Sequence, residues 1–418
     1  MGGRQRRQRR QRIAHMFLTL ILLCVPAFLV AAAGLLAGLV FLSRLSMPRV
    51  QRSGTVTLIL PLTGEADGLV ALLRALAAQT LPVRRLLICV EGVHDPAYAR
   101  ATELASTSST KSTISLPIEI LIAGEATHCA QKCCNQIAGL ARIDARDEVV
   151  VLFDADIVPP PWWLSALATP ILDGSADIVT GYRWPLLSGQ GCGAPLGAML
   201  AAQIAAAIDR GIALLPRLAA FPVTWGGSLA LSPRALEKLD AARLLGGTLS
   251  DDCSIGAQAA ALGLRVLTRR ALLVPTPASD GLAALWRFGR RQYQIIRVYR
   301  PPLWWLACLA LSSRVIAWGV LLANFGEVWA RLATLALLVI ALAAVGVQVF
   351  VGRRLGVADP LAVTVLQVVV ALCKPLVDVF HWSLMLAAWD TRVIRWGHLG
   401  YRVFGPGQIA IVSRRRWG

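Results

Sequence analysis

Apolar residues are concentrated at the two ends of the chain. Residues 16–42 contain no charged side chain, and a helix needs about 20 predominantly apolar residues to cross the hydrocarbon core of a membrane. We therefore predict a transmembrane helix over residues 16–43. A cleaved signal peptide is the alternative, but its apolar region is shorter than this one.

A second apolar part covers residues 302–389. Within it, residues 303–325 and 333–351 each have the length and composition of a span. Residues 360–389 are also apolar but contain charged side chains and a proline. They are compatible with one kinked span, a re-entrant hairpin or an interfacial helix pair. The pattern thus predicts one N-terminal span and two to three C-terminal spans.

The region between the spans, residues 53–285, has a different pattern. Short aliphatic and β-branched runs at 55–61, 85–90, 118–122 and 149–153 are separated by helical stretches. Strands that alternate with helices indicate parallel βαβ units, in which ligands bind at the carboxyl ends of the strands. The predicted fold class is α/β, with a Rossmann-like domain inserted between transmembrane helices.

The charged residues adjoin these apolar segments. Lys and Arg number 42 against 24 Asp and Glu, and only 16% of the residues are charged. The basic clusters lie in residues 1–15, predicted to be disordered, in an interfacial segment at 286–301 and in a tail at 390–418. This placement suits anionic lipid head groups, and the sequence contains no nucleic-acid-binding module. We therefore expect a membrane surface as partner and no nucleic acid.

The nine cysteines indicate neither a disulfide framework nor a zinc site. Their number is odd and no Cys-x-x-Cys pair occurs. Reduced thiols are typical of proteins that face the cytoplasm.

Two acidic pairs are the strongest candidates for chemistry. Asp154 and Asp156 directly follow the run at 149–153, and two carboxylates at a strand end can bind one Mg²⁺ or Mn²⁺. An acidic surface turn is the alternative. Asp251 and Asp252 precede a predicted helix, where an aspartate can cap free N–H groups or act as a base. Both roles are open for this pair.

Two further segments can contribute to a ligand site. In residues 223–228, Gly226 permits close approach of the backbone and the ring of Trp225 can form the wall of a sugar site, although a plain turn has the same composition. The arginines of the interfacial segment either anchor the chain to anionic lipid or neutralise a diphosphate. These arginines are Arg287, Arg290, Arg291, Arg297 and Arg300.

The order of these motifs resembles the family 2 and family 21 glycosyltransferases, and within them ceramide glucosyltransferase and the bacterial hopanoid and lipid glycosyltransferases. The likeness covers residues 53 to about 403. It rests on CVEGVHDPA, CAQKCCNQI, LFDADI, GYRWP, VTWGGS, LSDDCS and AAWDTRVIRWGHLGYRV, which follow one another in the order of the family. The resemblance implies a GT-A fold, a UDP-sugar donor with a glucose-like sugar, a lipid hydroxyl acceptor such as ceramide, and Mg²⁺ or Mn²⁺.

The resemblance also assigns roles by position. Glu91 and Asp95 would lie near uridine, and Lys132 and Asn135 belong to the segment CAQKCCNQI. Asp252 would be the general base, with Asp251 beside it. The remaining assignments are metal and diphosphate binding for Asp154 and Asp156, assistance to the leaving diphosphate for Arg290 or Arg291, and substrate contacts for Trp225, Gly226 and Arg297.

Two positions depart from the family pattern. Relatives have an aspartate after the second strand, where this chain has Glu91 and then Gly92. The family's (Gln/Arg)-x-x-Arg-Trp motif is also imperfect, because Gln292 follows Arg291 in place of tryptophan. Alternative matches are Gln294-x-x-Arg297 and Arg287-x-x-Arg290. The literal match, Arg392-x-x-Arg395-Trp396, lies beyond all the predicted spans and is interpreted as a decoy.

The sequence therefore predicts an inverting membrane glycosyltransferase in the bacterial inner membrane. UDP-sugars are cytoplasmic, which places the domain at 53–285 on the cytoplasmic side. The arginines of residues 1–15 favour the opposite orientation by the positive-inside rule. Two alternatives are a processive polysaccharide synthase, which would need a longer channel of spans, and a membrane scaffold that has lost catalysis.

Overall fold

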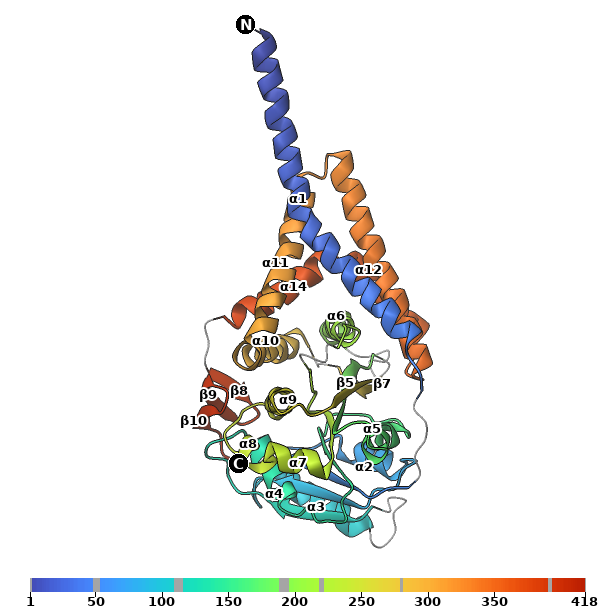
Figure 1. Ribbon diagram of the computed structural model, residues 1–418, viewed down its shortest axis with the longest axis vertical. Coiled ribbons are helices and arrows are strands. Elements are labelled where there is room, and N and C mark those ends of the chain that lie inside the picture. Colours follow the sequence, from blue (N-terminus) through green and yellow to red (C-terminus); the bar gives the residue numbers. More distant parts are fainter. Residues whose placement is uncertain are drawn as a thin grey trace.

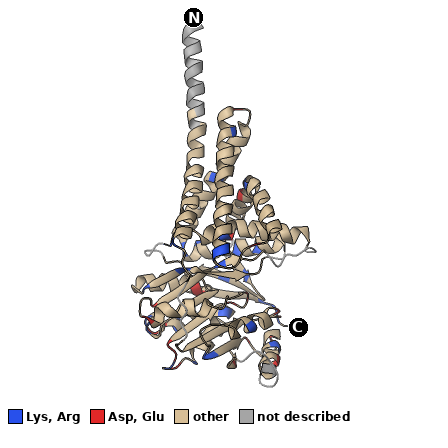
Figure 2. Cartoon of the chain, turned by 90° about the vertical axis from the view of Figure 1, so that its right-hand side faces the viewer, with Lys and Arg blue, Asp and Glu red and all other residues tan. Residues whose placement is uncertain are grey.

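The computed structural model has an α/β domain at one end and a bundle of long helices at the other (Figure 1). Few charged residues lie on the long helices, and basic residues gather where the helices meet the α/β domain (Figure 2). Side chains are described for Leu18 and from Leu20 onward, except those of Thr107 and Ser108. The described residues are 2–47, 53–108, 116–187, 195–217, 222–278, 281–389 and 393–417.

The α/β domain is built on a seven-stranded sheet with the order β3-β2-β1-β4-β6-β5-β7. Strands β1 to β4 are parallel, whereas β6 runs antiparallel to its neighbours β4 and β5. The first four strands coincide with the predicted runs to within one residue, which confirms the α/β fold class. The bounds are Val56–Leu62 (β1), Arg85–Val90 (β2), Ile118–Ile122 (β3), Val149–Phe153 (β4), Ile178–Pro185 (β5), Ser228–Leu231 (β6) and Val266–Thr276 (β7).

Helices cover both faces of the sheet because its strands are apolar on both faces. Along β1, Leu58 and Leu60 pack into one core and Ile59 packs into the other, as the alternation of a strand requires. Both cores are fully buried along this strand. The first core is covered by α2 (Leu69–Ala77), α3 (Pro96–Ser108) and α5 (Trp163–Leu172), and the second by α4 (Gln131–Leu140), α7 (Pro233–Leu239), α8 (Ala241–Leu245) and α9 (Asp251–Ala261).

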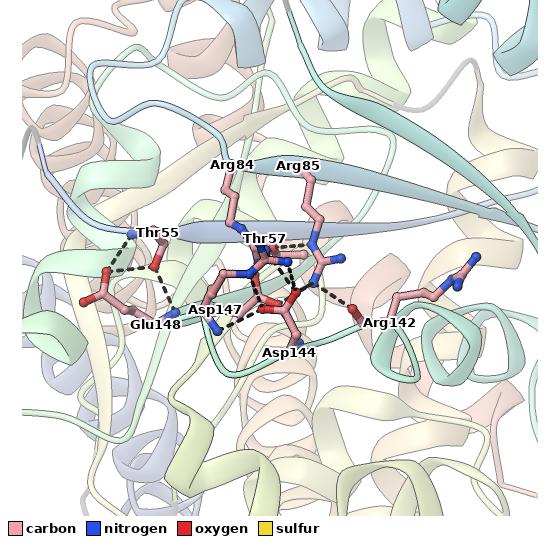
Figure 3. A network of polar contacts seen from close by, with 9 residues as sticks. Thr55, Thr57, Arg84, Arg85, Arg142, Asp144, Asp147 and Glu148 are labelled. Atoms are coloured by element: carbon pink, nitrogen blue, oxygen red, sulfur yellow. Dashed lines mark hydrogen bonds and ion pairs between the residues drawn. The ribbon is translucent and has the colours of Figure 1, made fainter.

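A charged network ties together the amino ends of β1, β2 and β4 (Figure 3). Arg84 lies 3.0 Å from Asp144, and Arg85 lies 2.5 Å from Asp147. Arg84 and Thr57 also donate to Asp147. Burial opposes ionisation of Asp147, but these hydrogen bonds outweigh it and hold its pKa below the ordinary value. The network therefore fixes the strands at the edge opposite the expected ligand site.

Three long helices form the bundle. They are α1 (Gly2–Ser43), α11 (Pro301–Ala323) and α12 (Val328–Arg354), and α1 packs against both of the others. Each is long and apolar enough to cross a membrane, as is α6 (Leu196–Ala213), so the described part of the chain has four such helices. Residues 2–15, predicted to be disordered, continue α1 instead. Arginine and glutamine favour helix, which accounts for this difference.

Two helices lie across the base of the bundle. In Figure 1, α6 and α10 (Leu282–Tyr299) are seen nearly end-on, whereas α1, α11 and α12 run along the length of the molecule. Helix α10 coincides with the predicted interfacial segment, and it packs against α6, α11 and α14.

The last two apolar helices form a bent pair. Helix α13 (Leu361–Leu372) and helix α14 (Lys374–Ala387) meet at an angle of 78°. This bend is compatible with a broken span or a re-entrant loop, two of the three arrangements expected for residues 360–389.

The C-terminal residues, predicted as a basic tail, form a small antiparallel sheet. Its strands are β8 (Val393–Trp396), β9 (Leu399–Gly405) and β10 (Gln408–Arg414). Tyr401 is buried in the core beneath α4, and its hydroxyl accepts a hydrogen bond from the backbone N–H of Gln131 at 3.1 Å. Alternating apolar and polar positions account for the strands. Residues 390–392, part of the predicted tail, lie outside the described residues.

Candidate active site

A cavity of about 1020 Å³ connects the carboxyl ends of the sheet strands with the long helices. At the sheet edge it is lined by Asp154, Asp156, Asp251 and Asp252, the two acidic pairs predicted from the sequence. Its wall continues past α10 and then between α1, α11 and α12. The site therefore opens both toward the sheet edge and toward the membrane helices.

Lys132 joins the two aspartate pairs. Its ammonium group lies 2.7 Å from an oxygen of Asp154 and 3.0 Å from an oxygen of Asp251. Burial opposes its charge, but Asp154, Asp251 and Asp252 outweigh burial and raise the pKa of Lys132 well above its ordinary value. The lysine, in the first turn of α4, is thus a permanent cation at the centre of the site.

The two aspartates at the start of α9 have different environments. Asp251 is 1% exposed and accepts a hydrogen bond from Gln136 at 2.7 Å. Burial opposes its ionisation, but Lys132 and Gln136 outweigh burial and lower its pKa. Burial and the charge of Asp251 raise the pKa of Asp252. Of the pair, Asp252 therefore has the greater affinity for a proton, which suits a base.

The segment VTWGGS, residues 223–228, contacts Asp252 through its backbone. The backbone N–H of Gly226 donates to Asp252 at 3.0 Å. A Cβ atom at Gly226 would lie 2.8 Å from the ammonium group of Lys132 and 3.0 Å from both carboxylate oxygens of Asp251. A larger residue at this position would therefore displace Lys132 and Asp251 from their present places. Trp225 lines the cavity next to Tyr182, with ring centroids 6.2 Å apart.

Asp154 and Asp156 follow β4, as the strand-end argument predicts. Asp156 is exposed to the cavity, yet the surrounding protein desolvates it, and this desolvation together with Asp154 raises its pKa. A divalent cation would relieve the crowding of negative charge, so the donor set fits a hard metal ion. Among the described residues, no group of three or more His, Cys, Asp or Glu can hold a metal by itself. Oxygen atoms of a substrate would have to complete the coordination.

The arginines of α10 point in different directions. Arg291 lines the cavity, where burial lowers its pKa and the charge of Asp156 opposes that effect. Arg290 donates to the carbonyl of Ala387 at 2.9 Å, and Arg297 donates to that of Ala388 at 3.1 Å. The structure therefore brings Arg291 to the aspartates and leaves Arg290 and Arg297 at the end of α14.

Arg183 is a cation of this site that the sequence motifs did not single out. It lines the cavity, lies 2.6 Å from Asp209 of α6 and interacts with Asp156. It shares the ring of Phe288 with Arg291, the Arg183 guanidinium lying 4.3 Å and the Arg291 guanidinium 5.4 Å from the ring centroid. Its place in the segment GYRWP was the one available signal.

Glu91 lies at the carboxyl end of β2 but is enclosed by the C-terminal sheet. Arg414 contacts one of its oxygens, His398 lies 2.8 Å from the other, and Trp417 donates to that oxygen at 3.3 Å. Neighbouring Asp95 accepts N–H groups of Gly64 and Ala97, at 2.8 and 3.0 Å. No sequence motif predicted that the C-terminal residues would reach this edge.

Asn135 lies behind the site. It is fully buried and donates to the carbonyls of Leu62 and Cys89, at 3.2 and 3.0 Å, while its own oxygen accepts from Gln131 at 2.9 Å. Its amide group thus ties β1 to β2 and faces the scaffold. A substrate contact, as expected from the family motif, would require these bonds to break.

Comparison with known proteins identifies one sequence family. The model of glycosyl transferase family 21 matches residues 19–409. No curated protein matches the chain. Among solved structures, a mannosyltransferase from Pyrobaculum calidifontis in complex with GDP-Man and Mn²⁺ is similar at 16% identity and a TM-score of 0.42, covering 88% of this chain and 99% of that chain. Glucosyl-3-phosphoglycerate synthase from Mycobacterium tuberculosis, in complex with Mn²⁺, UDP and glucosyl-3-phosphoglycerate, is similar at 17% identity and a TM-score of 0.27, covering 47% and 69%.

Proposed function

The chain belongs to glycosyltransferase family 21, and we propose that it transfers a sugar from a UDP-sugar to the hydroxyl group of a membrane lipid, with inversion at the anomeric carbon. Family membership confirms the resemblance drawn from the motifs. The single observation that carries the proposal is the cavity, because it joins the aspartates at the sheet edge to the space between membrane-length helices. A water-soluble donor and a lipid acceptor can meet at that junction.

In this proposal Asp252 is the general base. The acceptor hydroxyl gives its proton to the Asp252 carboxylate while the oxygen forms a bond to the anomeric carbon. The bond from that carbon to the diphosphate oxygen breaks with its electron pair, and UDP leaves. Attack from the face opposite the leaving group inverts the configuration. The raised pKa of Asp252 supports this role, and Ser250 orients its carboxylate with a hydrogen bond of 2.5 Å.

The leaving diphosphate meets the cations that surround Asp156. Arg291 and Arg183 line this part of the cavity from two different elements, and Lys132 lies beside Asp154. Fixed cations stabilise the negative charge that develops on a departing diphosphate. A Mg²⁺ or Mn²⁺ ion held by Asp154 and Asp156 would supply further charge neutralisation there.

A glucose-like sugar and a hydroxylated membrane lipid are the proposed substrates, and ceramide is the example of such a lipid that the resemblance of the motifs implies. The UDP-sugar places the α/β domain on the cytoplasmic side of a bacterial inner membrane. The eight described cysteines are free, which is compatible with that compartment.

The test is mass spectrometry of lipid extracts from cells that express the wild type or Asp154→Ala. We expect a hexosylated lipid that is present with the wild type and at least about a hundredfold lower with the variant, because the site loses a ligand for metal and diphosphate. Lys238→Ala is the matched control, since Lys238 lies on α7 and does not line the cavity. A polysaccharide product would favour a processive synthase, and no product from the wild type would favour a catalytically inactive scaffold.

A further inference from the structure

Three charged residues lie in the membrane part of the cavity, outside the proposed catalytic group. Arg314 belongs to α11, and Lys374 and Asp378 belong to α14. Arg314 lies 2.6 Å from Asp378, Lys374 contacts the same carboxylate oxygen, and Trp318 donates to the other oxygen at 3.0 Å. All four side chains line the cavity. We refer to Arg314, Lys374 and Asp378 as the α11–α14 charge cluster.

The α11–α14 charge cluster carries one more positive than negative charge. An arginine has five N–H donors and a lysine ammonium has three. Among the described residues, the recorded ion pairs of Arg314 and Lys374 both go to one oxygen of Asp378. His381, one turn further along α14, is engaged with the hydroxyl of Tyr293 at 2.5 Å and supplies no negative charge. The cluster thus has donor capacity that its single carboxylate does not use.

The excess charge faces the cavity. The side chain of Asp378 is 1% exposed, whereas those of Arg314 and Lys374 are 22% and 23% exposed. The carboxylate therefore lies behind the two cations. Water is scarce between membrane helices, so an unmatched charge there is costly and favours a bound anion. Ionisable residues inside a membrane segment commonly mark a substrate pathway.

The cluster lies on the membrane side of the aspartates. In Figure 1, α9, which carries Asp252, lies below α10, while α11 and α14 extend above it. The cavity continues between α1 and α12, where Gly34, Gly38 and Ala344 line it. A lipid with its tails between these helices and its polar end toward Asp252 would place its head group beside the cluster.

We propose that Arg314 and Lys374 bind the phosphate of the lipid in the cavity, so that the acceptor carries an anionic group as well as its hydroxyl. The acceptor role rests on the proposed function, whereas phosphate binding does not. Guanidinium and ammonium groups together match the oxygens of a phosphate. This site favours an anionic hydroxylated lipid over uncharged ceramide.

Binding to the purified full-length protein tests the proposal without catalysis. Native mass spectrometry is performed with phosphatidylglycerol, ceramide or inorganic phosphate added at equal concentration. We expect phosphatidylglycerol to bind at least about tenfold more tightly than ceramide, and Lys374→Met to lose about tenfold of this preference, the effect of removing one hydrogen bond to a charged group. Lys374→Met should fold, because Arg314 and Asp378 remain as a neutral pair. Arg331→Met is the control, since Arg331 lies exposed on α12 and outside the cavity.

Transfer from UDP-glucose to the two lipids is then measured with the same proteins. The inference is supported if the wild type transfers glucose preferentially to phosphatidylglycerol and if Lys374→Met raises the KM for that lipid. Equal binding of ceramide, unchanged binding by Lys374→Met, or inorganic phosphate competing as well as the lipid would overturn it. Selective binding of phosphatidylglycerol without transfer to any lipid would support the phosphate site and contradict the proposed function.

Discussion

The charged groups at the two edges of the central sheet differ in how completely they are paired. At the amino edge, two arginines face two aspartates, and the side chain of Asp147 has no exposed surface (Figure 3). At the carboxyl edge, Lys132 contacts Asp154 and Asp251, while Asp156 interacts with Arg183 and Arg291. The same kinds of side chain are thus satisfied at one edge and crowded at the other.

This difference separates a structural role from a chemical one. At the amino edge the partners hold the pKa of Asp147 below its ordinary value, so the charged form stabilises the fold. At the carboxyl edge burial and neighbouring carboxylates raise the pKa of Asp156 and of Asp252. Binding of a cation or a proton relieves that crowding, which is typical of a functional site.

The largest expected effect is the loss of catalysis in Asp252→Asn, a change at the carboxyl edge. Asparagine has nearly the same shape but cannot accept the acceptor's proton, so kcat should fall about 10²- to 10⁴-fold. Steady-state transfer assays measure this loss, and calorimetry should show that UDP still binds.

Ser232→Ala is the control for Asp252→Asn, because Ser232 caps α7 and does not line the cavity. Its kcat should match that of the wild type. If Asp252→Asn kept kcat within tenfold of the wild-type value, Asp252 would not be the base.

The next largest expected effect is a loss of stability in Asp147→Asn, a change at the amino edge. Removal of one partner of a buried ion pair costs about 3–5 kcal/mol, and the loss here should be smaller, about 2–3 kcal/mol, because both arginines are one-fifth exposed. We expect the Tm of the purified protein to fall by roughly 4–12 °C. The kcat of the remaining folded protein should stay within about twofold of the wild-type value.

Glu103→Gln is the matched control for Asp147→Asn, since Glu103 forms an exposed ion pair with Arg100 on α3. It should change Tm by about 1–2 °C or less. A Tm of Asp147→Asn equal to that of the wild type would show that the amino-edge network contributes little to stability.

Much of the carboxyl edge could be predicted because short-range patterns determine it. The aliphatic runs define β1, β2 and β4, and a residue that directly follows a parallel strand must lie at the ligand-binding edge. Asp154 and Asp156 needed no other information. For Asp252 the order of motifs was also required, because an aspartate before a helix has the same sequence pattern when it acts only as a cap.

The direction of the arginines in α10 could not be predicted. Successive residues of a helix point about 100° apart, so Arg290 and Arg291 face different neighbours. Sequence shows that the helix is amphipathic but not whether a given face meets α14 or the cavity. The length and apolar character of α6, which suit a membrane span, were also not predicted. An alanine-rich stretch within an α/β region has the same pattern as an ordinary helix of a soluble domain.

Contacts of the C-terminal sheet were also beyond prediction. Trp417 reaches Glu91 across 326 positions of sequence, and nothing local in either segment indicates the pairing. From their composition, residues 390–418 were predicted only as a basic tail. The alternating apolar positions of β8 to β10 were short enough to be hidden by that composition.

The smallest effect concerns Glu91, a carboxylate at the carboxyl edge that already has partners from the C-terminal residues. Trp417 donates its indole N–H to Glu91 and also packs against His398, with ring centroids 4.4 Å apart. The motifs imply that Glu91 contacts the uracil base. In that case the N–H of the bound base must replace the N–H of Trp417 as the donor to Glu91. Trp417→Ala should therefore lower KM for UDP-glucose about three- to tenfold, the value of one hydrogen bond, and leave kcat unchanged.

Trp417→Phe separates the hydrogen bond of Trp417 from its ring. It removes the indole N–H but keeps an aromatic side chain, so it should lower KM by about as much as Trp417→Ala if the contact with Glu91 is the competitor. A higher KM in Trp417→Ala that Trp417→Phe restores would mean that the ring stacks on the base instead. In that case the C-terminal sheet would complete the donor site, and the pairing of Glu91 would be part of substrate binding and not an obstacle to it.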